Sequence, residues 1–181
     1  AVSGISTVFW TDDFEPILRR LTRSFETIFL SHNEHGRSAA PVNYYREDRF
    51  RLWCQDRYPH HRYERLAPLL HRLRVEKSEP EIELIQKACE ITSDGFSRVL
   101  RFVKPGVKEY EIEAEFLHEF IQQGSRGFAY EPIIASGGNA NVLHYLSNDQ
   151  TCEEGDLLLM DVAAEYANYN SDLTRTIPVS G

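Results

Sequence analysis

The hydrophobic pattern of this sequence changes from a helical to an extended period at Tyr130, and this change constrains the fold most. Before Tyr130, two amphipathic helices are predicted. The first begins at a capping box formed by Ser78 and Glu81 and ends at Pro105. The second covers residues 109–123, with apolar side chains on one face and glutamates elsewhere. These two predicted helices do not fit an all-β protein.

After Tyr130, short apolar stretches separated by turn residues predict strands. These stretches are Glu131–Ser136, Asn141–Leu146, Asp156–Val162 and Asp172–Val179. Two helices followed by antiparallel strands predict the α+β fold class for this part of the chain.

Residues 1–74 follow a different order. Gly4–Trp10 and Thr27–Leu30 are predicted strands, with a helix between them that has Pro16 in its first turn. His32–Val42 is predicted to be a loop, and Tyr44–Arg74 is predicted to be helical with a break at Pro59. This order is typical of part of an α/β layer domain, and two strands are too few for an independent sheet.

Charge divides the chain near Lys77. Residues 44–77 hold nine Arg or Lys against five Asp or Glu, whereas residues 78–181 hold seven against eighteen. A protein that binds nucleic acid needs a basic face, so the acidic second part argues against that partner. Acidic side chains can instead supply oxygen ligands to hard divalent cations.

The length of 181 residues corresponds to one domain, or to one domain and part of another. The sequence contains no apolar run long enough to span a membrane. Cys54, Cys89 and Cys152 are odd in number and far apart, so we expect reduced thiols in a cytoplasmic protein. Residues 1–10 lack signal-peptide features and an initiator Met, so we expect a chain truncated from a longer protein.

Asp161 and Asp172 form the most informative local arrangement. They are eleven positions apart, and each lies in a predicted apolar strand. A hairpin of this length can bring both carboxylates together, and a buried carboxylate needs a partner or a metal ion. Such a pair suits Mn²⁺, Mg²⁺ or Co²⁺. Alternatively, each aspartate caps a turn, or Asp172 pairs with Arg175.

Other histidines and glycines carry weaker signals. His144 lies in a predicted strand and is either a core residue or a proton-transfer group. His32, Glu34 and His35 lie in a predicted loop, which lacks the helical spacing of zinc-binding motifs. Gly137 and its neighbours do not match a phosphate-binding motif.

Three segments together resemble the pita-bread metallopeptidases. They are Glu76–Ile91 (EKSEPEIELIQKACEI), Ile134–Asn148 (IASGGNANVLHYLSN) and Gly155–Gly181 (GDLLLMDVAAEYANYNSDLTRTIPVSG). Within that family, the sequence is most similar to aminopeptidase P, the Xaa-Pro aminopeptidase. The resemblance implies that residues 75–181 are the N-terminal half of the pita-bread catalytic domain. Residues 1–74 more weakly resemble the C-terminal part of the α/β, creatinase-like N-terminal domain.

The resemblance also implies roles for particular residues. Asp161 and Asp172 match the two metal-binding aspartates of the family, and His144 matches a catalytic histidine near the scissile bond. Tyr130 and Thr174 match positions next to the metal ligands. The implied cofactors are two divalent metal ions, with Mn as the expected metal and Co or Zn as alternatives. The family's further ligands, one histidine and two glutamates, have no counterpart in this chain.

The implied reaction is hydrolysis of an N-terminal Xaa-Pro bond by metal-activated water. The implied partner is a peptide with proline at its second position, with no nucleic acid and no membrane. The full-length enzyme is expected to be a homo-oligomer, and this chain alone is expected to be inactive. The alternatives are a prolidase that cleaves Xaa-Pro dipeptides, or a non-peptidase relative such as a creatinase-like or binding protein.

Overall fold

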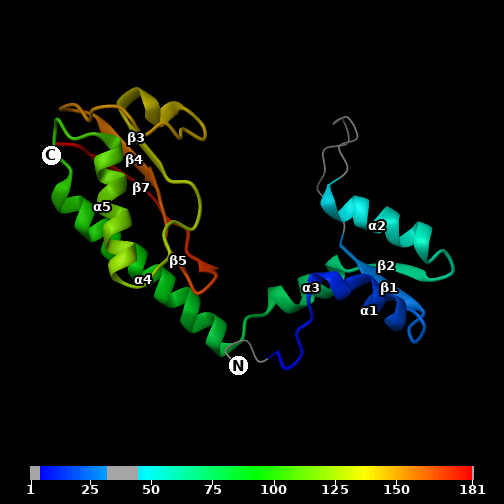
Figure 1. The fold of residues 1–181 in the computed structure, drawn as a ribbon. Helices are drawn as coiled ribbons and strands as arrows, with labels where there is room; N and C mark the ends of the chain where they lie inside the picture. The colour runs from blue at the N-terminus through cyan, green and yellow to red at the C-terminus, as the bar shows by residue number, and fades with distance from the viewer. Residues whose placement is uncertain (1–4, 32–44, 181) are drawn as a thin grey trace. The chain divides into compact units, whose positions relative to one another are not determined.

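The computed structural model describes residues 5–31 and 45–180. The chain separates into two compact units, Ala1–Glu76 and Lys77–Gly181, and this division falls where the charge of the sequence changes (Figure 1). Within the described parts of the chain, no helix has the length and apolar character needed to cross a membrane.

The first unit combines short helices with two paired strands. Its elements are η1 (Thr11–Asp13), α1 (Phe14–Leu21), β1 (Thr27–Leu30), α2 (Arg46–Arg57), β2 (Arg62–Arg65) and α3 (Ala67–Val75). β1 and β2 are parallel, with Thr27 opposite Arg62 and Leu30 opposite Arg65. The predicted strand Thr27–Leu30 and the predicted helix around Pro16 are therefore confirmed.

Two predictions for the first unit are wrong. Residues 5–10 form no strand, and their side chains are exposed. The predicted helical stretch Tyr44–Arg74 contains the strand β2. Backbone bonds of 2.9 Å from Arg62 N to Glu26 O and 3.0 Å from Leu66 N to Leu30 O hold β2 beside β1. The hydrogen bonds of this pairing outweigh the low intrinsic preference of such a polar segment for a strand.

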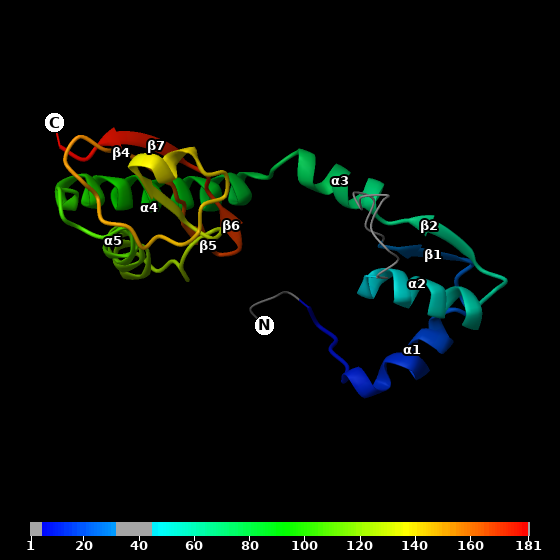
Figure 2. The same ribbon diagram turned by 90° about the horizontal axis from the view of Figure 1, so that it is seen from above.

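The second unit has two long helices followed by strands. Its elements are α4 (Glu79–Phe102), α5 (Glu109–Gln122), β3 (Ile133–Ser136), η2 (Gly137–Asn141), β4 (Leu157–Asp161), β5 (Glu165–Tyr166), β6 (Tyr169–Asn170) and β7 (Thr174–Pro178). β3, β4 and β7 form an antiparallel sheet in that order, and β5 pairs with β6 in a small hairpin beside α4 (Figure 2). The mixed α+β class is confirmed.

The helix boundaries follow from local chemistry. The Glu81 carboxylate accepts hydrogen bonds from the Ser78 backbone N–H at 2.7 Å and from the Ser78 hydroxyl at 2.8 Å, which confirms the predicted capping box. These bonds lower the pKa of Glu81, and the bond from the backbone N–H has the larger effect. α5 ends before Gly124, whose φ of 87° is the left-handed conformation that glycine adopts readily at a helix end.

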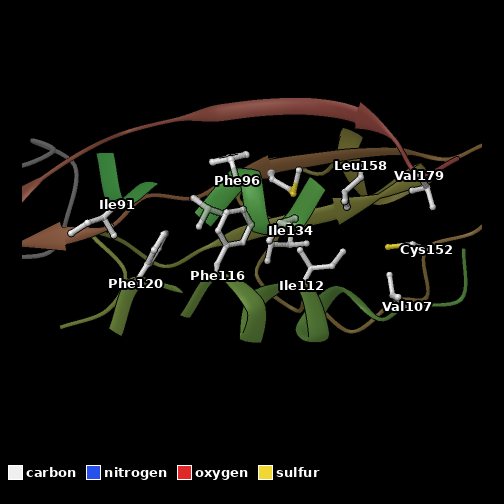
Figure 3. Packing of buried hydrophobic residues seen from close by; sticks show 14 residues of the cluster. Ile91, Phe96, Val107, Ile112, Phe116, Phe120, Ile134, Cys152, Leu158 and Val179 are labelled. Atoms are coloured by element: carbon white, nitrogen blue, oxygen red, sulfur yellow. The ribbon is translucent and has the colours of Figure 1, made fainter. Parts of the chain in front are cut away.

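The hydrophobic core lies between the two helices and one face of the sheet (Figure 3). Its fully buried side chains include Ile91 on α4, Phe116 and Phe120 on α5, and Leu158 and Met160 on β4. Removal of this apolar surface from water is the main force that holds the unit together. Because Leu158 and Met160 point into the core, alternation along β4 places Asp161 on the opposite face.

Two predictions for the strand region need correction. Asn141–Leu146 is not extended: η2 ends at Asn141, and a turn follows in which His144 has a φ of 54°. A positive φ is incompatible with a strand, so side-chain contacts and not strand pairing fix this segment. Asp172 is exposed and precedes β7, which begins at Thr174. Asp172 is therefore not buried in a strand.

Candidate functional site

The carboxylates of Asp161 and Asp172 converge on one tyrosine. The Tyr130 hydroxyl lies 2.7 Å from an oxygen of Asp161 and 3.1 Å from an oxygen of Asp172. These distances put the two oxygens well inside the roughly 8 Å beyond which carboxylates do not share ions about 3.5–4 Å apart. Spacing alone predicted the convergence, whereas a role as metal ligands stays a prediction.

The hairpin β5–β6 brings the two aspartates together. Ala167 and Asn168 at its tip have φ values of 51° and 68°, the pair of positive angles found in tight two-residue hairpin turns. Below the hairpin, the Val162 N–H donates to the Leu173 carbonyl at 3.1 Å. The chain thus leaves the end of β4 at Asp161, reverses, and returns beside it.

A buried hydroxyl pair fixes the base of this hairpin to α4. The Thr92 and Ser171 hydroxyl oxygens are 2.6 Å apart, and the Ala164 N–H donates to Thr92 at 2.9 Å. The Thr92 hydroxyl also lies 3.0 Å from the Ala88 carbonyl on its own helix. Ser171 directly precedes Asp172, so these bonds set the position of that aspartate. The sequence pattern gave no signal for this contact, because a threonine inside a helix is common.

Tyr130 reaches the aspartates from the segment before β3. The Ala129 N–H donates to the Ala163 carbonyl at 2.8 Å, which holds the backbone next to Tyr130 against the chain after Asp161. Burial, and then the hydrogen bond to Asp161, raise the pKa of Tyr130 above its ordinary value. The phenol therefore stays protonated at neutral pH and can donate to a carboxylate.

Thr174 is opposite Asp161 in the β4–β7 register, and its side chain is exposed. The alternative partner for Asp172 is not found, because no ion pair joins it to Arg175 in the part of the chain that the structure describes. The Arg175 guanidinium instead donates to the Thr174 carbonyl at 2.8 Å.

His144 lies in the long connection between β3 and β4, and its side chain is exposed. The core-residue interpretation is therefore wrong. Its approach to the two aspartates stays a prediction. His32, Glu34 and His35, like the whole predicted loop His32–Val42, lie outside the described residues.

Glu109 is a residue that sequence reasoning missed. It is the first residue of α5 and is fully buried, yet the pattern of the helix placed it among the solvent-facing glutamates. Its carboxylate oxygens take hydrogen bonds from the segment that carries His144. A signal existed in hindsight: Glu109 follows the Lys104–Lys108 turn directly, where a first-turn carboxylate can face backbone N–H groups.

The oxygen atoms of Asp161 and Asp172 could supply some of the ligands of a hard divalent cation. Two carboxylates meet, and the second oxygen of each accepts no hydrogen bond from any described residue. Carboxylate oxygens are the ligands that such cations prefer. Among the described residues, however, no group of three or more His, Cys, Asp or Glu side chains is placed to hold a metal ion. Asp161 and Asp172 would therefore supply only part of a coordination shell.

Comparison with known proteins decides the family. The family model for metallopeptidase family M24 matches residues 83–181, more than half of the chain. The chain belongs to metallopeptidase family M24. The matched region of this M24 chain contains both aspartates and His144, and the predicted resemblance to the pita-bread metallopeptidases is confirmed. Membership implies metal ions as cofactors, without identifying the metal.

Individual relatives of this M24 chain are Xaa-Pro aminopeptidases. The Xaa-Pro aminopeptidase of Haemophilus influenzae is 44% identical over 114 residues, which are 63% of this chain and 26% of that protein. The solved structure of Pseudomonas aeruginosa aminopeptidase PepP matches with a TM-score of 0.80 and 30% identity, covering 95% of this chain and 39% of that one.

Zinc-substituted Escherichia coli aminopeptidase P, solved in complex with product, matches with a TM-score of 0.79 and 29% identity. That match covers 98% of this M24 chain and 40% of the Escherichia coli chain. The chain thus spans about a quarter of the length of the curated relatives that it matches.

Proposed function

We propose that the whole protein containing this chain is a dinuclear metal-dependent aminopeptidase that hydrolyses the N-terminal Xaa-Pro peptide bond. The observation that carries the proposal is the convergence of Asp161 and Asp172 on the Tyr130 hydroxyl. The family and the names of the relatives support the same reaction. In this proposal, residues 75–181 are the first half of the pita-bread catalytic domain, and residues 1–74 belong to the domain that precedes it.

Each site residue has a distinct task in this reaction. Asp161 and Asp172 would hold the ions, and Asp172 would bridge them. A bound divalent ion lowers the pKa of a coordinated water and stabilises negative charge on a carbonyl oxygen. The protonated Tyr130 keeps the carboxylates together, because its hydroxyl lies within hydrogen-bond distance of both and shares its one proton between them. His144 would move a proton or stabilise the oxyanion at the scissile bond, a task that suits an imidazole.

The proposed metal is manganese, with cobalt and zinc as alternatives. Because Asp161 and Asp172 are two ligands only, the remaining ligands would come from outside the described residues. We also place the reaction in the cytoplasm, since three cysteines, odd in number and far apart in the sequence, are typical of reduced thiols. A homo-oligomeric state of the whole protein belongs to the same proposal, and light scattering on the purified protein would test it.

The decisive experiment is an assay of the whole protein after metal removal and after addition of manganese. A Xaa-Pro-Yaa tripeptide should be cleaved only with metal, and a Xaa-Ala-Yaa tripeptide should not be cleaved. Preferential cleavage of a Xaa-Pro dipeptide would indicate a prolidase instead. Absence of cleavage of either substrate with metal bound would refute the peptidase proposal and favour a binding or creatinase-like relative.

A further inference from the structure

Glu109 is the most unusual buried group of the second unit. Its side chain has 0% exposure, although glutamate is almost never fully buried without partners. Four donors surround its carboxylate. One oxygen accepts from the Ser136 N–H at 2.8 Å and the Asn139 amide at 3.4 Å, and the other accepts from the Tyr145 hydroxyl at 2.7 Å and the Gln150 N–H at 3.0 Å. These bonds compensate for the loss of water around the charge.

All four donors belong to one continuous segment, residues 136–150, which we call the histidine loop. Ser136 ends β3 and begins the loop, Tyr145 lies in its second half, and Gln150 ends it. One carboxylate on α5 therefore holds both ends and the middle of the loop. The Glu109 N–H also donates to the Gln150 carbonyl at 3.0 Å, so the helix start and the loop end are bonded in both directions.

A second contact holds the loop near the same place. Asn148 is buried, and its side-chain oxygen accepts from the Ile134 N–H at 3.0 Å. Its amide donates to the Pro132 carbonyl at 3.0 Å and to the Glu113 carboxylate at 2.9 Å. Glu113 lies one turn after Glu109 on α5, so the same helix carries both carboxylates that bind the loop.

His144 takes no part in these bonds. Its ring makes no hydrogen bond to any described residue, and its φ of 54° is one that a non-glycine residue keeps only when its surroundings hold the backbone. The hydrogen bond from the next residue, Tyr145, to Glu109 is the contact nearest to His144 in the chain that can hold this backbone. The Tyr145 hydroxyl also lies 3.3 Å from the Asp149 carboxylate inside the loop, so the shorter bond to Glu109 is the one that ties the residue next to His144 to α5.

We propose that Glu109 is a positioning residue, which acts through Tyr145 to keep His144 in place for the reaction. The inference rests on the proposed function, because it assumes that His144 works on the substrate. Positional errors of about 1 Å at a reacting group can cost on the order of 100-fold in rate. Loss of the Tyr145–Glu109 bond should therefore lower kcat without removing metal.

The test compares two tyrosine variants of the whole protein. Tyr145→Phe removes the hydroxyl that bonds Glu109. Tyr63→Phe is the matched control in the first unit, since the Tyr63 hydroxyl lies 2.8 and 2.9 Å from two backbone carbonyls. Tyr145→Phe should lower kcat about 10- to 100-fold with KM and metal content unchanged. Tyr63→Phe should leave kcat unchanged. Equal values of kcat for Tyr145→Phe and the unsubstituted protein would overturn the proposal.

A double variant separates positioning from a general structural effect. In the His144→Ala background, Tyr145→Phe should cause no further loss of kcat, because the group that it positions is already absent. The same loss in both backgrounds would overturn the proposal. Glu109→Gln should match or exceed Tyr145→Phe, since its amide places a donor against the Ser136 or Gln150 N–H.

Hydrogen–deuterium exchange supplies a reading that does not depend on activity. Residues 137–147 should exchange faster in Tyr145→Phe and Glu109→Gln than in the unsubstituted protein, while α4 and β4 keep their protection. Unchanged exchange in that segment would overturn the proposal even if the protein cleaves no peptide. Absence of Xaa-Pro cleavage in the unsubstituted protein, with faster exchange in both variants, would refute the proposed function and leave the Glu109 contacts established.

Discussion

Two segments of the second unit carry the candidate site, and they are held in place in different ways. The aspartate hairpin, residues 161–172, is short and is held mostly by backbone hydrogen bonds of β4, β5, β6 and β7. The histidine loop has almost no strand structure and is held by side chains, above all by the buried Glu109. The first segment is held mainly by backbone bonds, with the Thr92–Ser171 hydroxyl pair at its base. The second is held by side-chain bonds to Glu109 and by those of Asn148.

This difference teaches where each segment is vulnerable. A sheet distributes its support over many backbone bonds, so one side-chain change in the hairpin should leave the aspartates near each other. In the histidine loop, by contrast, several hydrogen bonds end on the one buried carboxylate of Glu109. Loss of one donor therefore leaves that charged group with fewer hydrogen bonds. Substitutions in the two segments should therefore separate metal binding from catalytic turnover.

Asp172→Asn should have the largest effect. The amide lacks the charge and one of the two anionic oxygens needed to bridge ions, so we expect loss of metal-dependent turnover together with loss of bound metal. Elemental analysis and the Xaa-Pro-Yaa assay on the whole protein measure both. Asp94→Asn, at an exposed position of α4, is the control and should keep both. Full metal content in Asp172→Asn would contradict the ligand assignment.

His144→Ala should rank second. We expect kcat to fall by about 10²–10⁴, as for loss of an acid–base or oxyanion group, with metal content kept. His118→Ala, at an exposed position of α5, is the matched control and should behave like the unsubstituted protein. Loss of both ions in His144→Ala would show that the loop and the hairpin are not separate in function.

Thr92→Val should mainly affect stability. The valine fills the same space but cannot accept from the Ala164 N–H or bond the Ser171 hydroxyl, which are buried. The Ser171 hydroxyl keeps the Ala88 and Ala164 carbonyls as acceptors, so the buried Ala164 N–H is the group left unsatisfied, at a cost of about 1–3 kcal/mol. Urea unfolding would measure this loss against Thr176→Val, which is exposed on β7. A loss in Thr92→Val no greater than that of the control would mean that the hydroxyl pair does not hold the hairpin.

Gly137→Ala should have the smallest effect on the whole protein. Gly137 has a φ of 54°, and an added Cβ would lie 2.7 Å from the Asp156 carboxylate. The left-handed conformation alone costs a non-glycine residue about 1–2 kcal/mol. Gly138→Ala, where an added Cβ meets no atom within 4 Å, is the control in the same turn and should be close to neutral. Equal unfolding midpoints of both variants would show that the start of the loop adjusts freely.

Local sequence predicted the frame of the second unit well. The capping box at Ser78 and Glu81, the two helices, and the strands around Ile134, Leu158 and Ile177 all follow from residues that are neighbours in the chain. The convergence of Asp161 and Asp172 was also predictable, because eleven positions with a turn between them leave few arrangements for a hairpin.

Predictions failed where distant residues decide. β2 lies beside β1, 35 positions away in the register of Thr27 and Arg62, and its own polar sequence does not favour a strand. The apolar segment 5–10 favours a strand by composition, yet no described strand pairs with it. In both places, tertiary context outweighed the local preference of the segment for or against a strand.

What the sequence by itself determined is therefore the two helices after Ser78, the strands around Ile134, Leu158 and Ile177, and the meeting of the two aspartates. Only the tertiary structure decided that Glu109 is buried and that the histidine loop turns instead of extending. The bonds from Glu109 to Ser136, Tyr145 and Gln150 join residues 27, 36 and 41 positions apart. Periodicity reports on residues within a few turns of each other, so a buried charge satisfied from such distances leaves no local pattern to read.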